Sequence, residues 1–271
     1  YSVGDGSTTL NFHSAHVAGT IMASGFQPNA KGMAPQANAV GYDWNNDLSE
    51  VAASAANGML ISNHSYGFVY ENLGGANNWV IGAYIQESKD WDDIMYNAPY
   101  YLMVVAAGND GNDNITNASP LEGNADYDKL SGMSTAKNNL VIANGQDALI
   151  NGDGSLGNVV RNGSSSEGPT DDLRIKPDIM GNGTGLFSSY ESSDNSYGTI
   201  SGTSMASPNV AGSLLLLQQY YNNLNGVFMK ASTLKGLALH TADDTESVGP
   251  DANTGWGLMN TKAAAETIAN N

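Results

Sequence analysis

Ser204 stands in the segment ISGTSMASPNVAG, residues 200–212, where a turn of small residues leads into an apolar run with helical spacing. A serine at this point presents its hydroxyl at the N-terminus of a helix, where free N–H groups and the helix dipole stabilise developing negative charge. Pro208 fits the first turn of that helix, because a missing N–H group costs little there. Ser204 is therefore either a nucleophile for acyl transfer or the N-cap residue of a buried helix, a position that serine favours.

A serine hydroxyl needs a general base to act as a nucleophile, and the chain has 4 histidines. His13 opens the segment HSAHVAGT, at the start of a predicted helix of very small residues, and is the candidate base. His16 follows one turn later and is interpreted as a packed, hydrogen-bonded histidine. The two have a spacing that can bind metal, but no HExxH motif or third ligand accompanies them. His64 and His240 are interpreted as structural.

An acyl-transfer site also requires hydrogen-bond donors for the oxyanion. The segment VVAAGNDG, residues 104–111, is predicted as a strand that runs into a Gly-Asn turn. Open α/β sheets bind their ligands at this end of their strands, and the side-chain amide of Asn109 could donate a hydrogen bond there. Taken alone, Asn109 is better explained as an ordinary turn asparagine.

The hydrophobic pattern predicts the scaffold that must hold these residues in place. Short apolar runs that end in turn residues are typical of strands, and near-continuous runs such as LMVVAA suit central parallel strands covered on both faces. Segments with helical spacing lie between them. The predicted strands are 38–44, 60–67, 101–109, 139–146 and 176–181, and the predicted helices are 16–24, 47–58, 77–96, 205–224 and the tail TKAAAETIAN. This alternation predicts one α/β domain over residues 1–271, with three α/β/α layers and a mainly parallel central sheet.

The composition is acidic, with 27 Asp and Glu against 10 Lys and Arg and a formal net charge of -17. Nucleic acid and anionic membranes attract positively charged proteins, so neither is expected as a partner. The spare carboxylates favour hard cations, and a structural Ca²⁺ is expected, although the sequence assigns no metal ligands. The absence of cysteine excludes disulfides and thiolate metal sites. No stretch has the length of a transmembrane helix, and the start YSVGDGSTTL carries no signal-peptide pattern.

Two further segments carry motif-like patterns. GDGSLG, residues 152–157, matches G-x-G-x-x-G, but a loop follows it instead of the helix that binds a pyrophosphate, so no dinucleotide site is expected. GNDGNDNITN, residues 108–117, is rich in oxygen ligands but lacks the spacing of a calcium-binding EF-hand loop. Asp110 and Asp113 in this segment are equally well interpreted as turn residues.

Considered together, HSAHVAGT, VVAAGNDG and SGTSMASPNVAG resemble, in this order, the His, oxyanion-Asn and Ser motifs of the subtilisin-like serine proteases, the subtilases. Other parts of the chain agree with this resemblance, which extends from about residue 10 to the C-terminus. The matching segments are NHSYG at 63–67, RIKPDIMGNGTGLFSS at 174–189 and GWGLMNTKAA at 255–264.

The resemblance implies a role for each candidate residue. Ser204 is the nucleophile, His13 is the general base and later the general acid, and Asn109 binds the oxyanion together with the Ser204 backbone N–H. Two segments would form the walls of the substrate cleft, one of them as a strand edge that pairs with the substrate backbone. These segments are Ser65, Tyr66 and Gly67, and Ala106, Ala107 and Gly108. The small residues of the second segment would leave room for a bulky apolar P1 side chain.

The chain departs from the family pattern before His13. The family places a catalytic Asp about thirty residues or more ahead of this histidine, on the first core strand. Asp5 is the one carboxylate before His13, and within VGDGST it is interpreted as a turn residue. The motif HSAH also replaces the usual His-Gly-Thr-His, with changes at Ser14 and Ala15. We therefore expect the N-terminal strand region that carries the triad acid to be missing from this chain.

Two hypotheses about function follow. In the first, the chain is the peptidase domain of a secreted bacterial endopeptidase that needs no cofactor for its chemistry and acts on peptides or proteins. Residues 1–271 alone would then be weakly active or inactive, and an N-terminal fragment or propeptide would be an associated partner. In the second, the chain is a catalytically inactive subtilase-like module that binds peptide in the same cleft.

Overall fold

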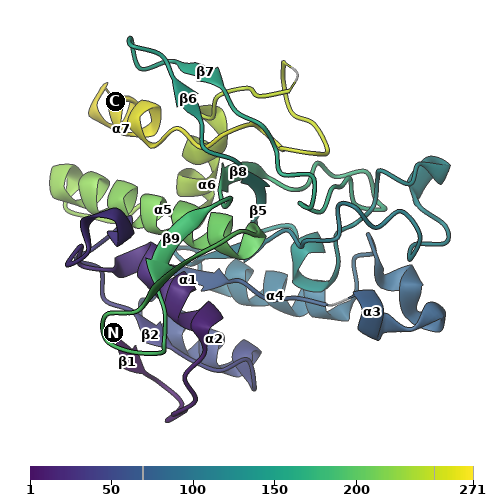
Figure 1. Cartoon of the computed structure of the whole chain (residues 1–271), viewed down its shortest axis with the longest axis horizontal. Coiled ribbons are helices and arrows are strands. Elements are labelled where there is room, and N and C mark those ends of the chain that lie inside the picture. The colour runs from purple at the N-terminus through teal and green to yellow at the C-terminus, as the bar shows by residue number, and fades with distance from the viewer. Residues whose placement is uncertain (69, 247, 271) are drawn as a thin grey trace.

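The centre of the fold is a parallel sheet with the strand order β3-β4-β5-β8 (Figure 1). The computed structural model describes residues 1–68, 70–246 and 248–270. The strands are β3 (Ile61–His64), β4 (Leu102–Ala106), β5 (Leu140–Gly145) and β8 (Ile179–Asn182). Every residue of β4 and β5 is buried, which explains why their sequences are apolar on both faces.

Helices cover both faces of this sheet. On one face α5 (Thr203–Asn225) crosses all four strands and packs with α1 (Phe12–Met22), α6 (Ala231–His240) and α7 (Thr261–Asn270). On the other face lie α2 (Asp47–Ala56) and α4 (Gln86–Asn97). Strand β4 contributes to both cores, because Leu102 and Val104 pack on the α5 side while Met103 and Val105 pack on the α4 side. The predicted three-layer α/β/α architecture is confirmed.

Shorter elements surround this core. The parallel pair β1 (Ser2–Val3) and β2 (Val40–Gly41) forms a small sheet of its own, near the N-terminus at the lower left of Figure 1. Two antiparallel pairs are β6 (Leu149–Ile150) with β7 (Leu156–Asn158) and β9 (Leu186–Ser189) with β10 (Tyr197–Ile200). The other short helices are α3 (Tyr70–Leu73) and the 3-10 turns Pro28–Ala30, Gly75–Val80, Leu121–Gly123 and Gly132–Thr135. The described helices include none with the length and apolar character that a bilayer span requires.

Three predicted elements differ from the structure. The run 38–44 contributes only the two residues of β2, outside the central sheet. The predicted helix 77–96 is divided into a 3-10 turn and α4, because Gly82 takes a φ of 78° and the chain bridges to Ser131 at this point. The first helix begins earlier than predicted, at Phe12, because the side chain of Asn11 caps it.

A buried ion cluster at the start of β8 joins this strand to β5. Asp178 pairs with Lys176 at 2.5 Å and with Lys235 at 2.9 Å, and it accepts a hydrogen bond from Val141 N at 2.7 Å. Burial alone would raise the pKa of Asp178, but the two lysines hold it below its usual value. Burial lowers the pKa of Lys176 to about 7. The carboxylate is therefore the counter-charge for two ammonium groups.

We predict that Asp178→Ala lowers the free energy of unfolding by about 3–5 kcal/mol, because it leaves the buried Lys176 without its counter-charge. Urea unfolding followed by circular dichroism measures the loss. Lys89→Ala is the matched control, since Lys89 pairs with Asp93 on the surface and both side chains are more than half exposed. A similar, small change in both variants would contradict the structural role given to Asp178.

Candidate active site

Asn109 follows β4 closely, and the first residue of α5 fixes its side chain. Thr203 N donates to Asn109 Oδ1 at 3.0 Å, and the single hydroxyl proton of Thr203 is within reach of both Asn109 Oδ1 and Gly108 O, each 3.2 Å from Oγ1. Because the amide oxygen accepts from Thr203, the NH₂ group of Asn109 points away from Thr203 and stays available as a donor. Thr203 Oγ1 also accepts from Gly108 N at 3.2 Å. The turn after β4 and the start of α5 are thus held as one unit.

Ser204 lies in the first turn of α5, and the N-cap of this helix is Gly202. The interpretation of Ser204 as an N-cap residue is therefore wrong. Its Oγ donates to Ser65 O at 3.3 Å, and Ser65 Oγ donates to Ser204 O at 2.9 Å. Asn63 connects the same two segments, because it donates to Ser65 Oγ at 3.0 Å and accepts from Ser207 Oγ at 2.7 Å. The structure brings Ser204 and Ser65 together at the carboxyl end of β3.

His13 occupies the first turn of α1. The side chain of Asn11 accepts from His13 N at 2.8 Å, and the ring of Phe12 packs edge-on against the imidazole. Burial lowers the pKa of His13, which keeps the ring neutral at pH 7 as a general base requires. Helix α1 packs against α5, the helix that carries Ser204. Among the described residues, no hydrogen bond joins the His13 ring to Ser204 or to a carboxylate.

Asp5 is the carboxylate nearest to His13 in the preceding sequence, and its oxygens bind backbone amides. It accepts from Ser7 N at 2.9 Å and from Asp43 N, and these bonds lower the pKa of Asp5. The interpretation of Asp5 as a turn residue agrees with this geometry, since it closes the turn after β1 and ties it to the chain after β2.

The two segments predicted to form the cleft walls follow adjacent strands. Ser65, Tyr66 and Gly67 come directly after β3, and Ala106 ends β4 ahead of Ala107 and Gly108. The Tyr66 hydroxyl is turned toward the protein interior, where it bonds to Asp47 at 2.9 Å and to His64 Nδ1 at 2.8 Å. Gly108 takes a φ of 116°, and a Cβ atom there would lie 2.7 Å from Ser166 Oγ, so this turn requires glycine.

Two of the other histidines are packed in the interior, as their sequence context predicts. His16 is fully buried and its Nε2 bonds to Leu186 O at 3.0 Å. His64 is buried between Ser62 and Tyr66, with Nε2 at 2.7 Å from Ser62 Oγ. Burial lowers the pKa of His64 to about 3, so the ring stays neutral in the folded protein. Its role is to anchor the strand end that carries Ser65.

The sequence did not single out Thr203, although its hydroxyl and backbone N–H orient Asn109. The available signal was its place directly before Ser204 in SGTSMAS, since a residue one position from a nucleophile shares the helix start.

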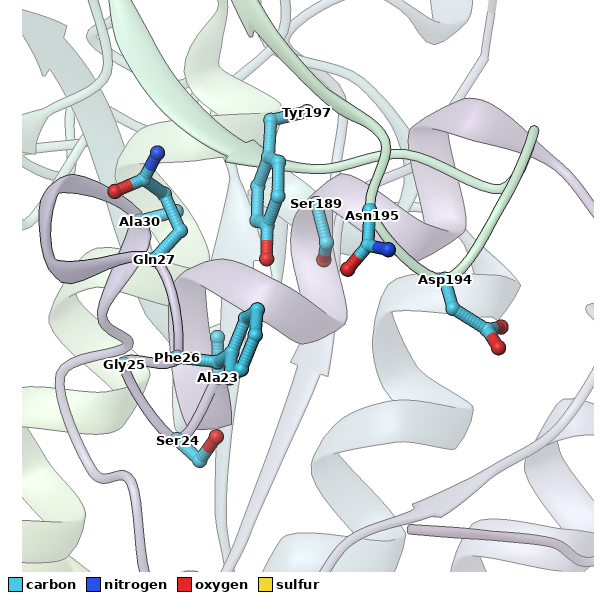
Figure 2. A pocket seen from close by; sticks show the side chains of 10 residues that line it. All are labelled: Ala23, Ser24, Gly25, Phe26, Gln27, Ala30, Ser189, Asp194, Asn195 and Tyr197. Atoms are coloured by element: carbon cyan, nitrogen blue, oxygen red, sulfur yellow. The ribbon is translucent and has the colours of Figure 1, made fainter.

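A cavity of about 350 Å³ lies away from these residues, between the chain after α1 and the β9–β10 hairpin (Figure 2). Figure 2 shows the rings of Phe26 and Tyr197 and the side chains of Gln27, Asn195 and Asp194 around it. None of the predicted catalytic or cleft residues lines this cavity. It is therefore not the site at which Ser204 would act.

Comparison with known proteins places the chain among peptidases. Residues 3–257 match the model of the Subtilase family (Peptidase S8). A stretch of 123 residues is 36% identical to a PII-type proteinase of Lactococcus lactis subsp. cremoris, and this match covers 40% of the present chain but 6% of that proteinase. Subtilisin DY of Bacillus licheniformis is 27% identical over 268 residues, which are 96% of this chain and 79% of subtilisin DY.

A solved structure supports the fold. The prenylagaramide maturation protease PagA matches with a TM-score of 0.71 and 18% sequence identity. The match covers 98% of this chain and 86% of that protease.

We predict that His64→Gln makes stability less sensitive to acid. The folded pKa of His64 lies below its unfolded value, so the unfolded chain takes up a proton that the folded protein does not. Stability from this residue is complete above about pH 6.5 and falls as the pH drops, by at most about 1.4 kcal/mol per pH unit for one proton. Urea unfolding at pH 7, 5.5 and 4 measures the slope. Equal slopes for the wild-type protein and the variant would rule out a buried neutral His64.

Proposed function

The chain belongs to the subtilase family, and we propose that it is a serine endopeptidase that cleaves peptide bonds through an acyl-enzyme on Ser204. The observation that carries this proposal is the fixed geometry around Asn109 and Thr203. The amide oxygen of Asn109 accepts from the backbone N–H of Thr203, the residue before Ser204, which leaves the NH₂ group to donate to a substrate oxygen near the start of α5. This is the arrangement that an oxyanion donor needs.

In the proposed mechanism, the neutral imidazole of His13 removes the Ser204 proton while Oγ attacks the carbonyl carbon of the substrate. Negative charge develops on the carbonyl oxygen, where Asn109 Nδ2 and the Ser204 backbone N–H donate to it. His13 then gives its proton to the leaving amine, and water releases the acyl group. Before these steps can begin, the hydrogen bond from Ser204 Oγ to Ser65 O must break.

The substrate is proposed to be a peptide or protein that lies between the chain after β3 and the chain after β4. Ser65, Tyr66 and Gly67 would pair with the substrate backbone as an added strand edge. Ala106, Ala107 and Gly108 would border the pocket for a bulky apolar P1 side chain. The negative charge of the protein favours substrates and surroundings other than nucleic acid or anionic membrane.

The proposal extends to the form in which the protein works. We propose an extracellular bacterial peptidase, because the family and the bacterial relatives named above fit that setting. Residues 1–271 by themselves are proposed to act slowly, with an N-terminal fragment or propeptide as a partner. The Asp5 carboxylate is engaged by backbone amides, which leaves His13 to be oriented by another acid.

A second candidate function is peptide binding without catalysis, in the same cleft. The hydrogen bond from Ser204 Oγ to Ser65 O favours it, because this bond directs the hydroxyl proton away from a base. In this alternative the edge after β3 would still bind an extended peptide.

Fluorophosphonate labelling separates the two functions. We expect a fluorophosphonate to label Ser204 in the longest form of the protein that can be expressed, and Ser204→Ala to abolish the label. Residues 1–271, verified by mass spectrometry, should label and hydrolyse peptides far more slowly, since loss of the triad acid costs on the order of 10⁴ in kcat. An unlabelled longer form would leave only the binding function, and rapid hydrolysis by residues 1–271 would overturn the need for a partner.

The oxyanion assignment has its own test. We expect Asn109→Ala to lower kcat by about 10²–10³, the usual cost of removing one oxyanion donor. Thr203→Val keeps the backbone N–H that binds Asn109 Oδ1 and removes only the hydroxyl. Its kcat should therefore fall only about fivefold, the effect of losing about one hydrogen bond. The measurement is kcat and KM for peptide hydrolysis, and KM should stay unchanged in both variants. An Asn109→Ala variant with normal kcat would show that another group binds the oxyanion.

A further inference from the structure

The cavity between the chain after α1 and the β9–β10 hairpin has one wall formed by a closed loop. Gly32 N donates to Ala23 O at 2.9 Å, so a backbone hydrogen bond closes the loop of residues 24–31. Gly25 has a φ of 89°, a conformation that favours glycine, and it directly precedes Phe26. The position of Phe26 at the cavity is therefore set by the shape of this loop.

The hairpin forms the opposite wall, and hydrogen bonds close its turn as well. Tyr190 N donates to Ser196 O at 2.8 Å, and Ser196 N donates to Ser193 O at 3.0 Å. Tyr197 follows this turn, and its ring stacks on Phe187 with the ring centroids 5.6 Å apart. This stacking fixes the ring of Tyr197 at the edge of the cavity, so both walls are formed before a ligand binds.

Hydrogen-bonding groups gather beside the ring of Phe26. Figure 2 shows the hydroxyl groups of Tyr197 and Ser189 and the amide of Asn195 pointing toward the same space. Ser189 Oγ donates to Ala15 O at 3.0 Å and can still accept a hydrogen bond. Within the described part of the chain, neither the Asn195 amide nor the Tyr197 hydroxyl has a hydrogen-bond partner. These two groups are therefore available to a ligand.

The residues around the cavity favour a neutral ligand. The ten residues that line it, all in the described part of the chain, include no Lys or Arg that would bind an anion. Asp194 is the one carboxylate among them, and Figure 2 shows it directed away from the two rings, so a cation between the rings would lack a counter-charge. Phe26 is 85% exposed and offers an apolar ring face beside groups that donate and accept hydrogen bonds. A sugar has the matching surfaces, an apolar face of C–H groups and an edge of hydroxyl groups.

We propose that this cavity binds a neutral sugar unit, such as the terminal hexose of a glycan. The C–H face of the sugar packs on the Phe26 ring, and its hydroxyl groups bond to the Tyr197 hydroxyl and the Asn195 amide. The volume of about 350 Å³ lies at the lower end of the range for small-molecule sites, which suits a single sugar ring. None of the predicted catalytic or cleft residues lines the cavity, so sugar binding leaves the cleft open and is independent of the proposed peptidase function.

Binding of neutral monosaccharides to the full chain tests the site. Ser204→Ala serves as the parent protein, so that the result does not depend on catalysis. The probes are glucose, galactose, mannose and N-acetylglucosamine, and binding is followed by saturation-transfer NMR and isothermal titration calorimetry. We expect at least one of these sugars to bind with a Kd in the millimolar range, because a small ligand in a surface cavity makes few contacts.

Three variants of the parent separate the parts of the site. Phe26→Ala should weaken the binding about tenfold, because it removes the ring on which the sugar packs, while Phe26→Trp should keep the binding. Tyr197→Phe keeps the stacking on Phe187 and removes only the hydroxyl, so the Kd should rise about fivefold, the effect of losing about one hydrogen bond. Tyr96→Ala is the matched control, since this ring on α4 is 82% exposed and lies outside the cavity.

Two further probes test the neutrality of the ligand. Choline chloride and sodium phosphate present a cation and an anion, and neither should bind at the concentrations at which the sugar does. The exposed position of Phe26 means that Phe26→Ala should unfold at the same temperature as the parent, so that lost binding is not lost folding. The proposal is wrong if no sugar binds to the parent, if Phe26→Ala and Tyr96→Ala bind sugar equally well, or if choline or phosphate binds in place of the sugar.

Discussion

The first turn of α5 is bound to the carboxyl ends of β3 and β4, and the position of the predicted nucleophile and oxyanion donor depends on this attachment. Thr203 binds Asn109 after β4, while Ser204 and Ser65 bind each other after β3. Because β3 and β4 are parallel neighbours, both strands end at the same edge of the sheet. Burial of α5 across the sheet then keeps its N-terminus, the positive end of the helix dipole, at that edge.

Burial also disfavours charge on the ionisable groups around this scaffold. Three of these groups show three different outcomes. His64 is kept neutral between two hydroxyl groups. Asp178 stays ionised because two ammonium groups compensate it. Asp128 faces the carboxyl group of Asp171, and burial together with that neighbour raises the pKa of Asp128 to about 7. In the first arrangement burial removes the charge, in the second the lysines compensate it, and in the third two carboxyl groups can share one proton.

Local sequence was sufficient to predict the elements whose cause is local. The unbroken apolar run of β4 predicts a strand covered on both faces, and the small residues before Ser204 predict a turn into a helix. Other features depend on contacts between distant segments. Nothing near residues 38–44 indicates that this run pairs only with β1, and the meeting of Asp128 with Asp171 follows from the path of the chain around Gly82. The role of Thr203 could not be predicted from the local sequence either, because its partner Asn109 lies in a distant segment of the chain.

The orientation of Asn109 bears on the choice between an enzyme and a binding module. A peptide that adds to a strand edge is held by backbone hydrogen bonds, and it needs no amide beside the serine. An oxyanion, in contrast, is stabilised only by donors that are already in place when the charge develops. The backbone N–H of Thr203 fixes the amide oxygen of Asn109, and its hydroxyl joins that oxygen to Gly108, an arrangement that a binding module would not require. The fixed amide therefore favours catalysis, and activity further depends on the orientation of the His13 ring, which bonds to no carboxylate among the described residues.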